Sequence, residues 1–342
     1  MDRKQRILIT GATGLVGSYL ARTLLNHGFT NVVALRRATS NFNLLGGKEN
    51  DLKWEVGDLL DGDFLEKVIQ EGDVLVHCAA LVSFAKKDVE LLESVNIDGT
   101  ANLVNICLEK KVKQFIHVSS VAALGRVKSG SRINEETEWT DSSENSAYAI
   151  SKHRAELEVW RGHAEGLKVA ILNPSIILGG GYWNDGSTSI IGSTAKGIPF
   201  YPVGGTGFVD VRDVVKLILL LMTKEVDGER FICNGHNVSY KEVFQKLASE
   251  LKAKVPSKPL PNILGSLAWR AAWLKSVFTG GTPMLTKETV RTSKFISIYD
   301  NKKSTALGME YRPLEDTFSD IGRVYQSGQS FAVLNVDTEE IG

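Results

Sequence analysis

The segment that most constrains the fold is residues 10–17, which read T-G-A-T-G-L-V-G. It follows a short apolar run of the kind that forms a strand, and it opens a helical pattern at 15–26. In such a turn Gly11 permits a tight bend, Gly14 lets the backbone approach a pyrophosphate, and Gly17 allows close packing of helix on strand. The N-terminus of the following helix attracts the anion. The segment therefore predicts a dinucleotide-binding turn between a first strand and a first helix.

Short apolar runs of β type alternate with helical patterns through the first half of the chain. The predicted strands are 6–10, 31–35, 52–56, 74–77, 114–118 and 168–172. The predicted helices are 15–26, 64–70, 89–109 and 147–163. Strands that alternate with crossover helices form a parallel sheet with helices on both faces. The pattern predicts an α/β fold with a Rossmann-type, doubly wound parallel sheet.

After Pro174 the pattern changes to loops rich in glycine, which predicts a smaller C-terminal lobe that shapes the substrate site. The expected NAD(P)-binding domain covers 1–174 plus about 206–235, and the substrate-binding lobe covers about 175–205 plus 236–330. Within this lobe, apolar residues at helical spacing predict an amphipathic helix at 263–278. Packing in the core of the lobe is the favoured role of that helix, and a wall of an apolar pocket is the alternative.

Composition argues against several classes of protein. The 40 basic residues balance the 40 acidic ones, so no net charge attracts nucleic acid or an anionic membrane. The cysteines, Cys78, Cys107 and Cys233, lie far apart and are odd in number, which fits neither a disulfide framework nor a zinc site. The most apolar later stretch, 214–222, is about half of the ~20 residues that a membrane span needs. We expect a cytoplasmic protein without a metal, a nucleic-acid partner or an integral membrane segment.

Two arginines occupy the position at which a dinucleotide fold usually carries an acidic residue, about 20 positions after the glycines. An acidic residue there binds the ribose 2′-hydroxyl of NAD, whereas a guanidinium pairs with the 2′-phosphate of NADP in a forked geometry. Arg36 and Arg37 therefore favour NADP as the cofactor, with NAD as the alternative. The competing interpretation is that both are ordinary solvated arginines of the surface.

A tyrosine and a lysine stand four residues apart near the start of the last predicted helix, so Tyr148 and Lys152 lie on one face of it. An adjacent cation stabilises a phenolate, so Lys152 is expected to lower the pKa of Tyr148. Such pairs are common on solvated helices, but here Ser119 and Ser120 follow a predicted strand upstream. Ligands bind at that carboxyl edge of a parallel sheet, so these residues together predict an active site.

Together these residues closely resemble the extended short-chain dehydrogenase/reductase family, which includes nucleotide-sugar epimerases, dihydroflavonol-type reductases and 3β-hydroxysteroid dehydrogenases. The resemblance covers residues 6 to about 235. The other matching segments are V-S-S-V-A-A-L-G at 118–125, G-D-L at 57–59, H-C-A-A at 77–80, N-I-D-G-T at 96–100 and L-N-P-S at 172–175. The resemblance implies that Ser120 is the catalytic serine, that Tyr148 is the acid/base, and that Lys152 binds the ribose and tunes Tyr148.

The resemblance also implies a set of residues that contact the cofactor along one edge of the sheet. They are Gly11, Thr13, Gly14, Leu15, Val16, Gly17, Arg36, Arg37, Asp58, Leu59, Cys78, Ala79, Ala80, Asn96, Ser119, Tyr148, Lys152, Pro174 and Ser175. One departure from the family concerns Asn173, which stands where an arginine is frequent in the nucleotide-sugar enzymes. This departure weakens the nucleotide-sugar interpretation.

The favoured function is reduction of a carbonyl, or oxidation of an alcohol, in a small or medium molecule by hydride transfer, as in dihydroflavonol-type reductases. A nucleotide-sugar epimerase or dehydratase is the first rival, because it uses the same residues. A non-catalytic protein that senses dinucleotides or serves as a scaffold is the rival from another class. The intact set of Ser120, Tyr148 and Lys152 argues against it. By analogy with the family, a homodimer is expected to use the helices at 89–109 and 147–163.

Overall fold

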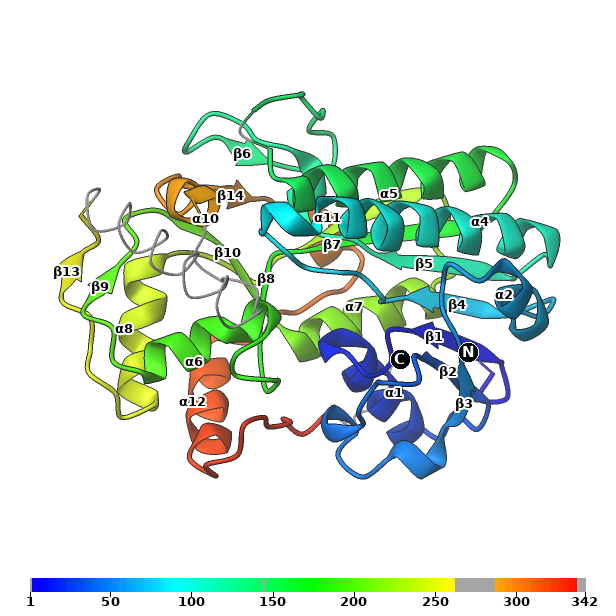
Figure 1. Ribbon diagram of the computed structural model, residues 1–342, viewed down its shortest axis with the longest axis horizontal. Helices are drawn as coiled ribbons and strands as arrows, with labels where there is room; N and C mark the ends of the chain where they lie inside the picture. The colour runs from blue at the N-terminus through cyan, green and yellow to red at the C-terminus, as the bar shows by residue number, and fades with distance from the viewer. Residues whose placement is uncertain (1, 144, 262–286, 337–342) are drawn as a thin grey trace.

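The computed structural model describes residues 2–143, 145–261 and 287–336. Its centre is a seven-stranded parallel sheet with strand order β11-β7-β5-β4-β1-β2-β3 (Figure 1). The strands are β1 (Ile7–Thr10), β2 (Val32–Arg36), β3 (Lys53–Val56), β4 (Val74–His77), β5 (Gln114–Val118), β7 (Val169–Pro174) and β11 (Glu229–Cys233). The strand order reverses between β1 and β4, which is where ligands bind in doubly wound sheets. The predicted Rossmann-type sheet is confirmed.

Helices cover both faces of this sheet because side chains alternate along each strand. Ile7 and Ile9 of β1 belong to one apolar cluster, and Leu8 between them belongs to another. The helices of the first cluster are α1 (Leu15–Asn26) and α7 (Val211–Thr223), and those of the second are α2 (Gly62–Val68), α4 (Gly99–Glu109) and α5 (Ala147–Ala164). Figure 1 shows α4 and α5 on one side of the strands and α1 and α7 on the other.

Two predicted helices differ in detail from the structure. The helix predicted at 64–70 begins two residues earlier, because the side chain of Asp61 caps it by accepting a hydrogen bond from the backbone nitrogen of Phe64 at 3.0 Å. The helix predicted at 89–109 consists of α3 (Val89–Leu92), a π-helical turn at Glu93–Asp98, and α4. Such turns are frequent at functional sites, and this one contains Asn96.

A second, smaller sheet has strand order β12-β10-β8. It comprises β8 (Ile176–Leu178), β10 (Gly205–Asp210) and β12 (His236–Ser239), and its helices are α6 (Ser189–Ala195), α8 (Tyr240–Glu250) and α12 (Leu314–Tyr325). Their apolar side chains form a separate core that includes Phe208, Leu247 and Phe318. The domain boundaries expected from the sequence stay a prediction. The amphipathic helix predicted at 263–278 lies outside the described residues.

Apart from short 3₁₀ turns, the remaining helices and strands of the described residues are short and lie outside these two sheets. They are β6 (Arg132–Ile133), β9 (Phe200–Tyr201), β13 (Lys258–Pro259), α10 (Lys287–Thr292), β14 (Ile298–Tyr299) and α11 (Lys302–Ala306). Within the described ranges, no helix has the length and apolar character needed to cross a membrane.

The segment after α12 runs back towards the N-terminal half of the molecule and packs against α1 (Figure 1). The hydroxyl of Tyr19 accepts a hydrogen bond from the backbone nitrogen of Leu334 at 2.6 Å and donates one to the carbonyl of Gly180 at 3.1 Å. The guanidinium of Arg22 donates to the carbonyl of Leu334. A buried tyrosine of α1 therefore joins three segments that lie far apart in the sequence.

Candidate active site

The glycine turn after β1 is crowded by backbone atoms. Gly11 has a φ of 67°, and a Cβ there would lie 2.6 Å from the backbone nitrogen of Ala79. A Cβ on Gly17 would lie 2.3 Å from the carbonyl oxygen of Gly11. The structure therefore requires glycine at both positions, at Gly11 for the bend and the contact with the end of β4, and at Gly17 for the packing of α1 on the turn.

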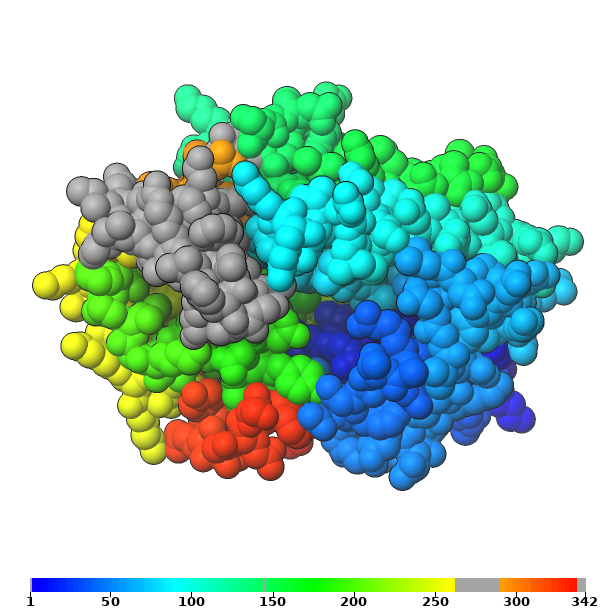
Figure 2. Space-filling model, in the orientation of Figure 1, coloured from blue at the N-terminus to red at the C-terminus, as the bar shows by residue number. Residues whose placement is uncertain are grey.

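The N-terminus of α1 lies at the carboxyl edge of the sheet. Its N-cap, Gly14, is exposed and has no side chain that could bond the amides of the first turn. Thr13, Leu15 and Val16 are partly exposed around it. Figure 2 shows N-terminal residues, in dark blue, inside a recess bounded by cyan and green segments. Backbone donors at the positive end of a helix dipole fit the pyrophosphate of a dinucleotide.

The chain after β4 is tied to the same turn. The backbone nitrogen of Cys78 donates to the carbonyl of Thr10, and that of Ala79 donates to the hydroxyl of Thr10, both at 3.2 Å. Ala80 follows as an exposed residue. The hydroxyl of Thr10 also lies 2.7 Å from Nδ1 of His77. These bonds place the backbone of 78–80 beside the glycine turn, where the family resemblance expects the cofactor.

Arg36 and Arg37 lie at the end of β2 and differ in their contacts. The guanidinium of Arg36 donates to the carbonyls of Arg37 and Ala38 at 3.2 and 3.4 Å. It also lies over the ring of Phe42, 5.1 Å from the ring centroid. Arg37 is exposed. Arg36 is thus held within its own loop, whereas Arg37 extends from the surface.

Asp58 and Leu59 follow β3, the neighbour of β2. Asp58 is exposed, and its carboxylate accepts a hydrogen bond from the backbone nitrogen of Leu60 at 3.0 Å. The carbonyl of Leu59 accepts one from the side chain of Asn102 at 3.2 Å. The segment lies beside the arginines because the backbone nitrogen preceding Asp58, that of Gly57, donates to the carbonyl of Arg36 at 3.0 Å.

Ser120 follows the end of β5 and is partly exposed. Its hydroxyl accepts a hydrogen bond from the backbone nitrogen of Ala122 at 3.2 Å, which fixes the turn after the strand. Its carbonyl accepts one from the side chain of Asn173 of β7 at 3.0 Å. The preceding residue, Ser119, is buried. Contacts from its own turn and from the next strand therefore hold Ser120 at the carboxyl edge of the sheet.

Tyr148 and Lys152 lie one turn apart at the start of α5. The helix begins there because Ser146 caps it, accepting a hydrogen bond from the backbone nitrogen of Ala149 at 2.8 Å. Tyr148 is partly exposed, whereas Lys152 is 1% exposed and its Nζ donates to the carbonyl of Val118 at 3.0 Å. The lysine therefore reaches from α5 to the end of β5, directly before the two serines.

The proton affinities of Tyr148 and Lys152 depend on burial first. Burial raises the pKa of Tyr148, and a hydrogen bond with the side chain of Ser120 opposes the rise. The expectation that Lys152 lowers the pKa of Tyr148 below its ordinary value is therefore wrong for this structure, since burial outweighs the opposing interactions. Burial also lowers the pKa of Lys152 to about 8, against the opposing effects of Glu156 and Cys78. Ser120 therefore acts on Tyr148, and burial reduces the proton affinity of Lys152.

Asn96 is buried in the π-helical turn and bonds two parts of the site. Its amide oxygen accepts a hydrogen bond from the backbone nitrogen of Leu81 at 2.7 Å. Its amide nitrogen donates to the carbonyl of Leu81 at 3.0 Å and to the hydroxyl of Ser151 at 2.9 Å. Ser151 in turn donates to the carbonyl of Tyr148 at 2.9 Å. Asn96 thus ties the loop after β4 to the turn of α5 that carries Tyr148, and its direct contact with a cofactor stays a prediction.

Two residues at the site were not found from the sequence. Phe84, in the loop held by Asn96, meets the ring of Tyr148 edge to face with centroids 5.7 Å apart. No pattern marks a single aromatic residue in a loop. Glu156 is buried on α5 one turn after Lys152, and this spacing of four residues is the signal that could have found it.

Of the last predicted cofactor residues, Pro174 ends β7 and Ser175 follows it; both are buried, and the hydroxyl of Ser175 donates to the carbonyl of Cys233 at 3.4 Å. The three cysteines are free thiols. In the part of the chain that the structure describes, no cluster of histidine, cysteine and carboxylate side chains could hold a metal ion.

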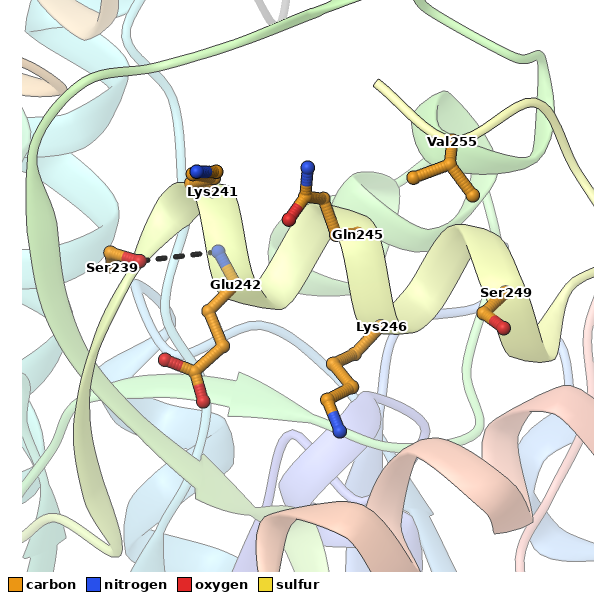
Figure 3. Close-up of a pocket in the computed structure, with 7 residues that line it drawn as sticks. All are labelled: Ser239, Lys241, Glu242, Gln245, Lys246, Ser249 and Val255. Carbon is orange, nitrogen blue, oxygen red and sulfur yellow. Dashed lines mark hydrogen bonds between the residues drawn. The ribbon is translucent and has the colours of Figure 1, made fainter. Parts of the chain in front are cut away.

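A separate groove of about 590 Å³ runs along the outer face of α8. Figure 3 shows side chains of α8 around it, with Ser239 capping the helix at the backbone nitrogen of Glu242 at a distance of 3.2 Å. The residues that line it are Ser239, Lys241, Glu242, Gln245, Lys246, Ser249 and Val255. None of them belongs to the catalytic or cofactor set, so this groove is distinct from the candidate active site.

Comparisons with known proteins match most of the chain. The model of the NAD dependent epimerase/dehydratase family matches residues 7–233. A putative dihydroflavonol 4-reductase of Synechocystis sp. is 30% identical over 329 residues, which are 93% of this chain and 94% of that protein. A UDP-glucose 4-epimerase of Vibrio cholerae is 30% identical over 277 residues, 76% of this chain and 80% of that protein. The crystal structure of gox2253 is 31% identical with a TM-score of 0.79, covering 96% of this chain and 99% of that one.

Proposed function

Because the chain belongs to the NAD-dependent epimerase/dehydratase family, we propose that it is an NAD(P)-dependent oxidoreductase that reduces a carbonyl or oxidises an alcohol through Ser120, Tyr148 and Lys152. The observation that carries the proposal is the meeting of these side chains at one edge of the sheet. The side chain of Ser120 interacts with that of Tyr148 and lowers its pKa, and Lys152 reaches from the same helix as Tyr148 to the end of β5, directly before Ser119 and Ser120. The glycine turn stands at the same edge, where the strand order reverses.

Each residue has a defined task in this proposal. The glycine turn and the N-terminus of α1 hold the pyrophosphate, and a bound nicotinamide cofactor supplies or accepts the hydride. In the reducing direction Tyr148 gives its phenolic proton to the carbonyl oxygen, and Ser120 donates a hydrogen bond to the developing alkoxide. Lys152, as an ammonium, binds the ribose hydroxyls and places positive charge beside Tyr148. Oxidation reverses these steps.

The preferred cofactor in this proposal is NADP. Arg37 is exposed at the end of β2, so its guanidinium can turn towards a 2′-phosphate without breaking a buried contact. Arg36 already bonds the carbonyls of Arg37 and Ala38, and it would have to release them to make the same pair. Arg37 is therefore the main candidate for the 2′-phosphate, and Arg36 adds positive charge beside it.

The substrate in this proposal is small or medium in size and apolar around the reacting carbon. Phe84 packs against the ring of Tyr148 and offers an apolar wall there. Asn173 is buried and bonded to Ser120 and Glu156, so the position at which sugar enzymes often have an arginine offers no guanidinium. The relative from Synechocystis sp., which aligns over nearly the whole chain, is named as a reductase.

A nucleotide-sugar epimerase is the second candidate function. It is supported by the UDP-glucose 4-epimerase of Vibrio cholerae, which has the same identity to this chain, 30%, over a shorter alignment. Such an enzyme would use the same serine, tyrosine and lysine but would retain its cofactor through each cycle. The non-catalytic alternative has less support, because burying Lys152 is unfavourable and a scaffold has no need of it.

We extend the proposal to a cytoplasmic homodimer. Leu91 of α3 and Leu157 of α5 have exposed fractions of 51% and 52%, which leaves apolar surface on the helices expected at the interface. The equal numbers of basic and acidic residues argue against nucleic acid as a partner.

The experiment that tests the proposal first is the identification of any nucleotide released when the purified protein is denatured. Protein that releases no nucleotide, binds NADPH more tightly than NADH, and then oxidises NADPH in the presence of a carbonyl compound supports the reductase. Stoichiometric release of NAD favours the epimerase and contradicts the role of Arg37. Failure to bind either dinucleotide would contradict both functions.

A further inference from the structure

Glu156 is a buried carboxylate that the proposed reaction does not use. It lies on α5 one turn after Lys152 and is 1% exposed. A carboxylate is costly to bury unless cations and hydrogen-bond donors compensate its charge. Its neighbours show how that compensation is achieved.

Side chains from three elements surround Glu156. Asn173 of β7 donates from Nδ2 to one carboxylate oxygen, and Arg230 of β11 places a guanidinium nitrogen 3.6 Å from the other. Lys152 precedes Glu156 by four residues, so the two side chains share a helix face. Burial raises the pKa of Glu156, and Ser119, Arg230, Asn173 and Lys152 lower it. The guanidinium of Arg230 and the ammonium of Lys152 thus favour the charged form of Glu156, against the effect of burial.

Arg230 is itself fixed in place. Its guanidinium donates to the carbonyls of Glu135 and Thr137 at 2.7 and 3.3 Å. The carboxylate of Glu135 accepts a hydrogen bond from the backbone nitrogen of Ile232 at 2.8 Å, which anchors this loop to β11. These bonds therefore fix the position of the Arg230 guanidinium beside Glu156.

The same cluster holds the backbone that carries Ser120. The ammonium of Lys152 donates to the carbonyl of Val118 at 3.0 Å. Nδ2 of Asn173 donates both to the carbonyl of Ser120, at 3.0 Å, and to Glu156. Glu156 therefore fixes the orientation of the amide that binds the Ser120 carbonyl, and the strand end is held on both sides of Ser119.

The other titratable groups near Lys152 are neutral. Burial raises the pKa of the Cys78 thiol to about 12 and lowers the pKa of His77 to about 3. Burial lowers the pKa of His117 well below its ordinary value, and it raises that of Tyr148. Of the described groups that act on Lys152, Glu156 is thus the carboxylate that can supply negative charge, and it opposes the lowering of the Lys152 pKa.

We propose that Glu156 is a positioning residue, whose carboxylate keeps the Lys152 ammonium charged and, through Asn173, fixes the backbone that carries Ser120. It touches neither substrate nor cofactor. The inference rests on the proposed function only in treating Ser120 and Lys152 as members of the reacting set. Without the carboxylate, a lysine this deeply buried loses its proton more readily.

The test is a pH titration of Lys152 in the full chain, monitored by NMR of protein labelled with ¹⁵N-lysine. The signal of Lys152 is identified by its absence from the spectrum of Lys152→Arg. Glu156→Gln removes the charge but keeps the oxygen to which Asn173 donates. We expect the titration midpoint to fall by about one pH unit or more, because a buried opposite charge at this spacing shifts a pKa by that order. A midpoint that does not move would overturn the proposal.

The matched control is Glu158→Gln, on the same helix. Glu158 pairs with Arg161 at 2.9 Å on the surface, so the midpoint of Lys152 should move by no more than about 0.2 pH units. In a carbonyl-reduction assay, Glu156→Gln should move the alkaline limb of kcat/KM to lower pH by the same amount as the NMR midpoint. In Glu156→Asp, which keeps the charge, the alkaline limb should return to its position in the unmodified protein. An alkaline limb that stays in place in Glu156→Gln would contradict the proposal.

Arg230→Gln provides a second test if Glu156→Gln does not fold. Arg230 is 21% exposed, and its loss removes a cation that lowers the pKa of Glu156. The acid inflection of the Lys152 signal, which reports protonation of the neighbouring Glu156, should therefore move to higher pH. A Lys152 signal without that inflection, or an inflection that does not move, would overturn the proposal. Both NMR titrations are independent of enzymatic activity. An inactive chain with the expected shifts would refute the proposed function and leave the role of Glu156 standing.

Discussion

The two ends of the proposed cofactor site are held in different ways. At the reaction end, Ser120 and Lys152 are bonded to carbonyls and side chains of neighbouring elements, and Asn96 ties Tyr148 to the loop after β4. At the opposite end, Arg37 is exposed and Arg36 bonds the carbonyls of its own loop. Buried bonds therefore fix the geometry of the chemistry, whereas the choice between NADP and NAD depends on surface charge that can change with little effect on the fold.

The largest expected effect is at the reaction end. Tyr148→Phe should lower the turnover of a carbonyl substrate by about 100-fold or more, because the variant has lost its general acid. Binding of NADPH, measured by quenching of protein fluorescence, should survive. Tyr325→Phe, at the end of α12, is the control and should keep its turnover. Unchanged turnover in Tyr148→Phe would remove this residue from the mechanism.

The glycine turn between the two ends should respond almost as strongly. Gly11→Ala introduces a Cβ 2.6 Å from the backbone of Ala79 at a positive φ, and we expect it to lower the free energy of unfolding by about 3 kcal/mol or more. Gly47→Ala is the matched control: its φ is 83° and nothing lies within 4 Å of the new Cβ. Conformational strain alone should reduce its stability by about 1–2 kcal/mol. If urea unfolding gave the same loss of stability for Gly11→Ala and Gly47→Ala, the contact with Ala79 would be unimportant.

At the arginine end we expect a smaller and more selective effect. Arg37→Ala should weaken the binding of NADPH about tenfold, the value of one charge-assisted contact of about 1.5 kcal/mol, and should leave the binding of NADH unchanged. Arg36→Ala should weaken NADPH binding less, because Arg36 is engaged within its loop. Fluorescence titration of both variants with both dinucleotides checks this. Equal weakening of NADH and NADPH binding would mean that Arg37 does not contact the 2′-phosphate.

Buried histidines of the central sheet should make the stability of the fold depend on pH. His77 lies beside β1 with its pKa lowered to about 3 by burial, so its neutral form is favoured in the folded state. The stability gained in this way is complete above the unfolded pKa of about 6.5 and is lost as the pH falls from there towards 3. We expect the free energy of unfolding to fall by about 1.4 kcal/mol per pH unit for each such histidine.

His117→Phe checks this expectation, since burial lowers the pKa of His117 in the same direction. Neither ring nitrogen of His117 has a hydrogen-bond partner among the described residues, so its replacement should change little at pH 7. Urea unfolding at several pH values should give a shallower acid slope in the variant. An unchanged slope would mean that acid unfolding begins elsewhere.

Much of the fold was predictable from the sequence, because the glycine turn and the alternating patterns are local signals. The boundary of α2 was missed because it depends on the cap at Asp61, and the π-helical turn because no pattern in the sequence marks it. The catalytic set was suggested by the spacing of Tyr148 and Lys152. The role of Glu156 could not be predicted from the sequence, because its partner Arg230 comes from a strand much later in the chain. The predicted sign of the Tyr148 pKa shift was also wrong, because the shift is dominated by burial, which depends on tertiary packing.

The bonds of Tyr19 have a consequence for synthesis of the chain on the ribosome. α1 emerges among the first residues, yet the backbone donor that satisfies its buried hydroxyl belongs to Leu334, close to the end of the described chain. Until that segment has been translated, the hydroxyl lacks its backbone donor and bonds water instead, and the apolar surface around it on the first helix stays open to solvent. Products of premature termination would therefore expose this surface even when the strands of the large sheet are complete, and chaperones and proteases could recognise them by it.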